Sequence, residues 1–360
     1  MKLHAKRVIP LLIIALMSIT GKTQITTPRT PSPAAAVSQT IGISKVTIDY
    51  SRPSVKGREV WGKLVPYGWN VQNFGNGHSA PWRAGANENT TITFSHAAVV
   101  EGKDVPAGEY GLFFVINEDN TGELILSKDY RSWGSFFYEE KNDLIRSKIQ
   151  TRSIPMTEML TYDFINLTKT SAELVLNWEK KQFPVKIEFD VDKIVLNNAA
   201  EELKGPAGFN WQGYNSAANY ALQNKTGYEQ ALQWSDQAVA QNPSFNTLST
   251  KGNLLRAMGK MADADTMMNK AIAIANENEL NIYGYNLLNA GQQDKAIEIF
   301  ILNTKRNPKS ANAFDSLGEG YATKGDKKNA IINFKKSLSM NPPANVKANS
   351  EKFLKQLGEM

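Results

Sequence analysis

The stretch AFDSLGEGYATKGDKKNAIINFKKSLSMNP, Ala313 to Pro342, decides how the C-terminal half of this chain folds. Its apolar residues recur at helical spacing, which predicts amphipathic helices. Three weaker copies of the stretch precede it in the chain. Alanines that correspond to Ala330 stand at Ala231, Ala264 and Ala296, at offsets of 33, 32 and 34 residues. A repeat of this period indicates an array of stacked helical hairpins.

The repeated unit resembles the tetratricopeptide repeat, a helix–turn–helix unit of about 34 residues. In the last copy, that family's signature positions are occupied by Phe314, Leu317, Gly318, Tyr321, Ala330, Phe334 and Pro342. The position twelve residues before each alanine holds Asn219, Gly252, Gly284 or Gly318, where two helices are expected to approach closely. The first two copies are degenerate, because Ser235 and Met268 stand where the family has Phe. Four units are expected from Gln212 to about Asn345, with a cap helix at Val346–Leu357.

The resemblance implies a scaffold that binds a protein or peptide partner along a concave face lined by the first helix of each unit. The positions that face inward in this register are rich in Asn and Tyr. The predicted peptide-groove residues are Tyr220, Asn246, Asn253, Arg256, Asn278, Asn281, Tyr285 and Asn312. Asn can pair with both amide groups of an extended backbone, and Tyr supplies rigid contact area. The groove lacks the Lys and Arg pairs of the family's carboxylate-clamp members, so an acidic C-terminus is not the expected ligand. The alternative is that these Asn residues only solvate the inner face.

The N-terminal half has a different period. From Lys45 to Val191 short runs such as VTIDY and TTITFS alternate apolar and polar residues, separated by clusters of Gly, Pro, Asn and Asp. This pattern predicts an antiparallel β-sandwich or a jelly roll, with one short helix at Glu139–Arg146. The expected organisation is a signal peptide at residues 1–23, a lead-in at 24–44, the β-sandwich at 45–195, a hinge at 196–211 and the repeats at 212–358.

The first residues, MKLHAKRVIPLLIIALMSITGKTQ, have the pattern of a secretory signal peptide. The apolar run is about a dozen residues, which is short for a membrane span. Cleavage near Thr23–Gln24 would leave 37 of the 41 basic residues against 35 acidic ones, so the net charge would fall from +6 to +2. Nucleic acid is therefore not an expected partner. The chain has no Cys, which excludes disulfides and a lipid on an N-terminal Cys. We expect a periplasmic or secreted protein with no stable membrane span after cleavage; an uncleaved anchor is the alternative.

The segment Tyr50–Ser95 resembles a bacterial family of exported proteins known only as a domain of unknown function, number 2911 in its series. The matching elements are Ser51-Arg52-Pro53, Gly57-Arg58, Trp61-Gly62, Leu64-Val65-Pro66-Tyr67-Gly68, Trp82-Arg83 and Gly85-Ala86-Asn87-Glu88. The resemblance extends over residues 33–191, and the family often carries C-terminal tetratricopeptide repeats. One departure is the insert WNVQNFGNGHSAP, Trp69–Pro81, which could cover or reshape a site beside Trp82. The resemblance implies no activity.

The residues of this segment allow two interpretations, a ligand-binding site and a braced structural turn. Tryptophan offers a flat face to a sugar ring, arginine can hold a carboxylate or phosphate with two hydrogen bonds, and Asn and Glu add directional bonds. The predicted ligand-binding residues are Arg52, Arg58, Trp61, Trp82, Arg83, Asn87 and Glu88. The alternative is structural: the Trp side chains form core, Gly85 and Asn87 supply positive φ angles, and Arg83 pairs with Glu88 to brace a turn.

The sequence predicts no catalytic residues, no metal and no cofactor. Only His78 and His96 remain after processing, without ligand spacing between them, and no nucleophile elbow is present. We therefore expect a non-enzymatic binding or scaffold protein whose repeats mediate protein–protein interaction. The alternative is a carbohydrate- or anionic-ligand-binding protein, or a hydrolase, that acts through an Arg/Trp cleft of the β domain.

Overall fold

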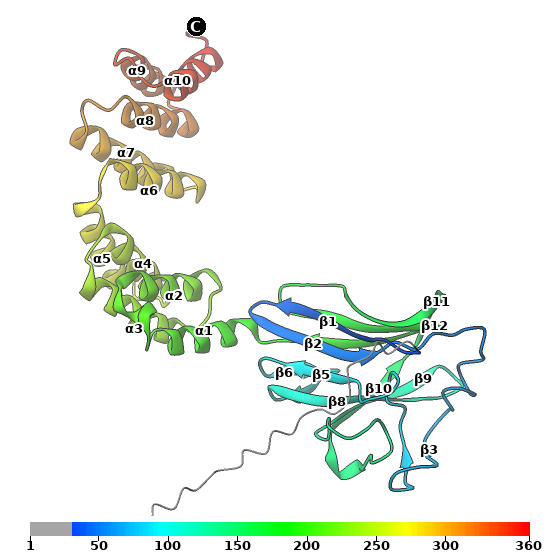
Figure 1. Ribbon diagram of the computed structural model, residues 1–360. Coiled ribbons are helices and arrows are strands. Elements are labelled where there is room, and N and C mark those ends of the chain that lie inside the picture. Colours follow the sequence, from blue (N-terminus) through cyan, green and yellow to red (C-terminus); the bar gives the residue numbers. More distant parts are fainter. Residues whose placement is uncertain (1–30) are drawn as a thin grey trace, which may run out of the picture. The chain divides into compact units, whose positions relative to one another are not determined.

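The computed structural model describes residues 31–360, so the predicted signal peptide lies outside the described part of the chain. The chain divides into two units, one ending at Phe189 and the other beginning at Asp190. Figure 1 shows strands in the first, called the β unit below, and helices in the second, called the helical unit. This confirms the predicted fold class, an antiparallel β domain followed by an array of helical hairpins.

All strand pairings of the β unit are antiparallel, and they form two larger sheets and one small hairpin. The sheet orders are β1-β2-β5-β8-β9-β10, β11-β12-β6-β7 and β3-β4. The strands are β1 (Ala34–Ile41), β2 (Ser44–Ser51), β3 (Asn70–Val71), β4 (Ser79–Ala80), β5 (Thr91–Phe94), β6 (Ala98–Val100), β7 (Lys103–Val105), β8 (Gly108–Ile116), β9 (Thr121–Ser127), β10 (Asp143–Gln150), β11 (Arg152–Ile165) and β12 (Ser171–Glu188).

The two larger sheets pack face to face around a core of aromatic and aliphatic side chains. On β2, Ile48 and Tyr50 are buried, as the alternation in the sequence predicts. Tyr50 lies edge-on to Tyr162 of β11, with ring centroids 4.8 Å apart. The ring centroids of Phe114 on β8 and Phe183 on β12 are 5.3 Å apart. Because full burial of such a side chain contributes about 1.5–3 kcal/mol, these contacts between the sheets stabilise the sandwich.

The edge strand β1 corrects the expectation of an unpaired lead-in up to residue 44. It pairs with β2 along its whole length, from Ala34 opposite Ser51 to Ile41 opposite Ser44. Gly42, at φ +60°, allows the tight turn of this hairpin. The Pro, Ser and Ala composition concealed a weak period of two, in which every second side chain is half-buried.

The short helix expected at Glu139–Arg146 is largely absent. A single 3-10 turn spans Glu140–Asn142, and the residues that follow form β10. Ile145 and Ile149 on β10 are buried at period two, and the strand pairs with β9. Charged residues in this segment hide the alternation in the sequence. Pairing with β9 stabilises the segment as a strand.

The helical unit consists of α1 (Val191–Glu202), a 3-10 turn (Pro206–Phe209) and nine further helices. They are α2 (Trp211–Gln223), α3 (Tyr228–Gln241), α4 (Phe245–Ala257), α5 (Met261–Ile274), α6 (Glu277–Asn289), α7 (Gln293–Arg306), α8 (Ala311–Lys324), α9 (Lys327–Leu338) and α10 (Ala344–Gln356). No helix within residues 31–360 is both long and apolar enough to cross a bilayer.

Helix α1 occupies much of the segment expected to be a hinge. The Asp190 side chain caps it by accepting a bond from the backbone N–H of Lys193 at 3.2 Å. Leu196 and Ala199 of α1 pack against the alanines of α2, so this segment belongs to the helical unit rather than linking two domains. The Pro–Gly run that follows has the composition of a linker, but Leu196 and Ala199 of α1 pack, half-buried, against the helical unit.

The hairpins are held by pairs of small and large side chains. A Cβ atom added to Gly284 of α6 would lie 2.4 Å from the ring of Phe300 on α7, and one on Gly318 would lie 2.8 Å from Phe334. At Gly252, whose unit carries Met268 in place of Phe, the nearest atom would be 3.2 Å away. The glycine is therefore required where the opposing side chain is an aromatic ring.

Candidate functional site

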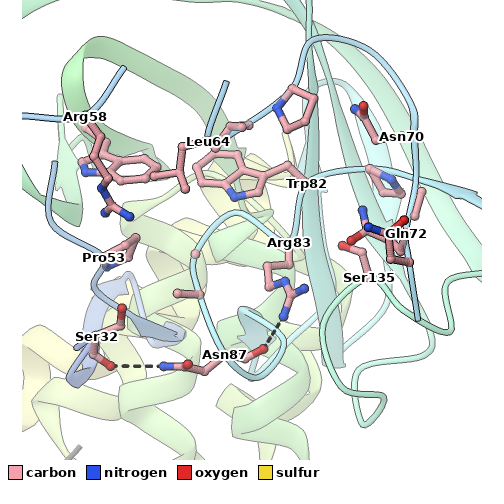
Figure 2. A pocket seen from close by; sticks show the side chains of 18 of the residues that line it. Ser32, Pro53, Arg58, Leu64, Asn70, Gln72, Trp82, Arg83, Asn87 and Ser135 are labelled. Carbon is pink, nitrogen blue, oxygen red and sulfur yellow. Dashed lines mark hydrogen bonds between the residues drawn. The ribbon is translucent and has the colours of Figure 1, made fainter. Parts of the chain in front are cut away.

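A cavity of about 680 Å³ lies in the β unit around Trp82 and Arg83. Figure 2 shows its wall: Arg58 lies on one side of Trp82, while Gln72 and Ser135 lie on the other, near Arg83. The stretch Trp82–Asn87 that forms its centre is fixed to the core, because the backbone of Trp82 exchanges two 2.9 Å hydrogen bonds with Phe114 of β8. The cavity therefore has a rigid frame.

Arg83 is half-buried in the wall of this cavity. Its guanidinium donates a 2.6 Å hydrogen bond to the carbonyl oxygen of Asn87 and lies 4.7 Å from the centre of the Phe136 ring. Gly134 allows this approach, since a Cβ atom there would lie 2.3 Å from the guanidinium. Burial lowers the pKa of Arg83, and no ion pair forms on it within residues 31–360. The guanidinium is thus held in place by neutral groups.

Two further cationic side chains line the same cavity. Arg58 is exposed and is oriented by hydrogen bonds to the carbonyl oxygens of Val55 and Ser54. Lys56 is also exposed, at the edge of the same loop. Among the described residues that line the cavity there is no Asp or Glu. The described part of the wall therefore carries three cationic side chains and no carboxylate.

The tryptophans divide between wall and core. Trp82 is half-buried and stacks on Trp178 of β12, with centroids 5.9 Å apart and planes at 16°; both line the cavity. Trp61 is buried behind them, edge-on to both rings. The structural interpretation therefore applies to Trp61, while Trp82 presents part of its surface to the cavity.

Two residues of the cavity lining, Ser135 and Trp178, are almost fully buried, at 2% and 1% exposed. The Ser135 hydroxyl and the Trp178 indole N–H make no hydrogen bond within residues 31–360. Both polar atoms are themselves almost inaccessible, so they are not open to a molecule in the cavity.

The insert at residues 69–81 forms one wall of the cavity. Its short hairpin β3-β4 brings Asn70 and Gln72 to the lining. The insert is fastened to another loop: the backbone N–H of Asn76 donates to the carbonyl of Phe136 at 3.0 Å, and Phe74 lies edge-on to the Phe136 ring. The insert therefore reshapes the surroundings of Arg83.

Of the seven residues predicted to bind a ligand, the structure brings together Arg58, Trp82, Arg83 and Asn87 around the cavity. The other three, Arg52, Trp61 and Glu88, do not line it. Arg52 instead ties β11 to its loop by bonds to the carbonyl of Leu160 and the hydroxyl of Thr161, at 3.0 and 2.7 Å.

The turn before β5 differs from the predicted one in its details. Positive φ angles occur at Ala84 and Asn87, not at Gly85. Gly85 is required for close approach, because its Cβ atom would lie 2.6 Å from the hydroxyl of Thr90. Arg83 bonds to the carbonyl of Asn87, where the bracing interpretation expected a pair with Glu88.

Four lining residues were not among those predicted. Lys56 and Gln72 belong to the same segment as the predicted site, whereas Ser135 and Trp178 come from distant parts of the chain that only the fold brings to the cavity. Among the described lining residues there is no His. No cluster of metal-ligating side chains occurs within residues 31–360.

The second candidate surface is the face formed by the first helices of the repeats, α2, α4, α6 and α8, called the first-helix face below. Its two ends are occupied by contacts within the chain. At one end Tyr220 donates to Asp192 of α1 at 2.8 Å, and burial together with this carboxylate raises the pKa of Tyr220 to about 12. At the other, Tyr285 donates to Glu319 at 3.0 Å, and Asn349 of α10 bonds to Asp315 at 2.8 Å.

The centre of the first-helix face is more open. Asn246 and Asn253 of α4 and Asn278 of α6 are exposed. Asn281 of α6 is half-buried, and its amide oxygen accepts no hydrogen bond within residues 31–360. Asn312 on α8 is half-buried as well. The predicted groove residues are thus divided between two closed ends and a central region rich in Asn.

A further cavity of about 700 Å³ lies between the second and third repeats. It includes Asn253 and Arg256 of α4, but α6 contributes Tyr283 and Asn286 rather than Asn281 or Tyr285. Arg256 pairs across it with Asp265 of α5 at 2.6 Å. The structure therefore separates Arg256 from the remaining predicted groove residues of α6.

Comparison with known proteins confirms the two resemblances and their order. Residues 32–187 match the model of a family described as a protein of unknown function, DUF2911. Residues 311–343 match a tetratricopeptide repeat, the copy in which the signature positions are best preserved. The description of the first family assigns it no activity.

Curated relatives and solved structures resemble only parts of the chain. A 59-residue stretch is 36% identical to cellulose synthase operon protein C of Escherichia coli K12, and covers 16% of this chain and 5% of that protein. The chain therefore spans a small fraction of the length of the curated relatives it matches. Among solved structures, YrrB, described as a TPR protein with an unusual peptide-binding site, is 19% identical over 45% of this chain and 84% of its own, with a TM-score of 0.28. MamA is 20% identical over 41% and 86%, with a TM-score of 0.29.

Proposed function

We propose that this chain is an exported, non-enzymatic scaffold whose tetratricopeptide repeats bind an extended segment of another protein. The observation that supports the proposal best is the central region of the first-helix face. There, Asn246 and Asn253 on α4 and Asn278 on α6 are exposed, and Asn281 on α6 is half-buried. Amide groups at the surface of neighbouring first helices can bond to the backbone of an extended segment.

The chemistry of this region selects the kind of partner. An Asn amide can donate to a carbonyl and accept from an N–H, so a row of Asn residues can bond to polypeptide backbone without fixing its side chains. We propose the second and third repeats as the binding region, because contacts within the chain occupy Tyr220 of α2 on one side and Asp315 of α8 on the other. We therefore place the partner segment along α4 and α6.

The proposed location is the periplasm or the outside of the cell. It is supported by the basic start, the short apolar run and the small residues of the first 24 positions, together with the absence of Cys from the chain. Mass spectrometry of the N-terminus of the protein from a periplasmic fraction should find a start near Gln24. An intact N-terminus in the membrane fraction would contradict export as a cleaved protein.

The protein-binding proposal predicts a defined loss of partner capture. The double variant Asn253→Ala/Asn281→Ala should recover any partner from an envelope extract about tenfold less well than the wild type, because two amide groups that bond to the partner are removed. Quantitative mass spectrometry of proteins captured by the full chain measures this.

The matched control removes two amide groups elsewhere. Gln237 and Gln241 lie exposed on α3, outside the first-helix face. The variant Gln237→Ala/Gln241→Ala should capture the partner as the wild type does. Equal capture by both double variants would show that the first-helix face is not the binding surface.

A second candidate function concerns the β unit. The cavity of about 680 Å³ beside Trp82 is large enough for a monosaccharide-sized ligand. Its rigid frame and the cationic side chains of its wall favour the binding of a small polar molecule over a purely structural role. This function would act independently of the repeats.

A further inference from the structure

We infer that the cavity of the β unit recognises the anionic group of its ligand, a carboxylate or a phosphate, through Arg83. The inference rests on the proposed ligand-binding function of the β unit and names the ligand class for it. It would make the β unit a sensor or carrier of an acidic small molecule, while the repeats bind protein.

The first argument is the state of Arg83. Taking a guanidinium partly out of water is unfavourable unless an opposite charge compensates it. Here the compensating groups are neutral: the carbonyl oxygen of Asn87 and the face of the Phe136 ring. They orient the guanidinium, and the hydrogen bond to Asn87 uses only one of its five N–H groups.

The second argument is the charge of the wall. Arg58, Lys56 and Arg83 all line the cavity, and no described lining residue is acidic. Surface loops usually intersperse both signs of charge, which makes a concave site of one sign unusual. Such a concave surface attracts anions and repels cations. Arginine is well suited to carboxylate and phosphate because its fork matches two oxygen acceptors.

The third argument comes from Trp82, which stands beside Arg83 in the cavity wall. The exposed part of Trp82 offers a flat surface for a sugar ring that carries the anionic group.

The test is isothermal titration calorimetry of the mature full chain at constant ionic strength, with chloride as the balancing anion. The probes are glucuronate, its neutral counterpart glucose and inorganic phosphate. We expect saturable binding of glucuronate, phosphate or both, and none of glucose. Binding of phosphate alone would identify a phosphate site; tighter glucuronate than phosphate would identify a carboxylate on a sugar-like ring.

The variant Arg83→Met should weaken binding of the anionic probe roughly 10- to 100-fold, as expected for loss of a charge-assisted hydrogen-bond pair. Arg58→Met provides a second variant on an exposed side chain, should Arg83→Met fail to fold. The control is Arg131→Met, which removes the same charge from an exposed residue that lies over Tyr130 and outside the cavity lining. Its binding should equal that of the wild type.

Three results would overturn the inference. Equal binding of glucose and glucuronate, unaffected by either cavity variant, would leave a ligand site but remove its selectivity for anions. No saturable binding of glucuronate or phosphate would refute the anion site and its ligand-binding premise together. Equal loss in Arg131→Met would assign the effect to overall charge. None of these results bears on capture of a protein by the repeats.

Discussion

Replacing Trp178 with Ala should lower the free energy of unfolding of the β unit by about 3–5 kcal/mol, the usual cost of truncating a large buried aromatic side chain. The ring is 1% exposed and stacks on Trp82, while Trp61 lies edge-on to it at 5.8 Å. Truncation would remove these contacts and enlarge the cavity behind Trp82. Calorimetric unfolding of the full chain should show the transition of the β unit at a lower temperature and that of the helical unit unchanged.

Trp133 provides the control for this substitution. It is 50% exposed, so Trp133→Ala should change the free energy of unfolding by no more than about 0.5 kcal/mol. A Trp178→Ala variant as stable as Trp133→Ala would mean that Trp178 is not part of the core that joins the two sheets. The packing described for β12 would then be incorrect.

Replacing Gly284 with Ala should destabilise the helical unit by about 1–3 kcal/mol, although alanine is the better helix former. The added methyl group would lie 2.4 Å from the ring of Phe300, which is fully buried and also packs edge-on against Tyr285. The ring cannot move aside without disturbing the third repeat. Urea unfolding followed by helical circular dichroism measures the effect.

The equivalent change at Gly252 is the matched control. Because Met268 stands opposite in place of an aromatic ring, the nearest atom to the new methyl group would be 3.2 Å away. Gly252→Ala should therefore change the stability by about 1 kcal/mol or less, in either direction. Equal destabilisation at both positions would contradict this explanation. It would show that glycine is required because the helix backbones approach closely, whether or not an aromatic ring lies opposite.

The repeat register was predictable from the sequence because it depends on local spacing. A period of 32 to 34 residues fixes which positions meet across each hairpin, and Gly284 and Phe300 meet as that period requires. Helix α1 was not predictable in this way, since it lies outside the repeat and resembles a linker in composition. The edge strand β1 also has the composition of a linker, so it was not predicted. Its pairing with β2 follows the turn at Gly42.

The candidate site of the β unit was predictable only in part. Trp82, Arg83 and Asn87 are neighbours in the sequence, and their residue types indicate binding. Ser135 and Trp178 reach the same cavity from other loops and strands, so no local pattern reveals them. Arg52 has the same chemistry as Arg83, but its guanidinium bonds to β11 instead. Residue type identified the candidates, and only the fold separates ligand-binding arginines from structural ones.

If the repeats bind a protein segment along α4 and α6, the backbone of these two helices should be protected in the complex. Hydrogen–deuterium exchange of the full chain, alone and saturated with the captured partner, tests it most directly. We predict slower exchange in peptides from Phe245–Ala257 and Glu277–Asn289, with no change in the outer helices α5 and α7 or in the β unit. Protection confined to α5, α7 or the β unit, with α4 and α6 unchanged, would contradict the account.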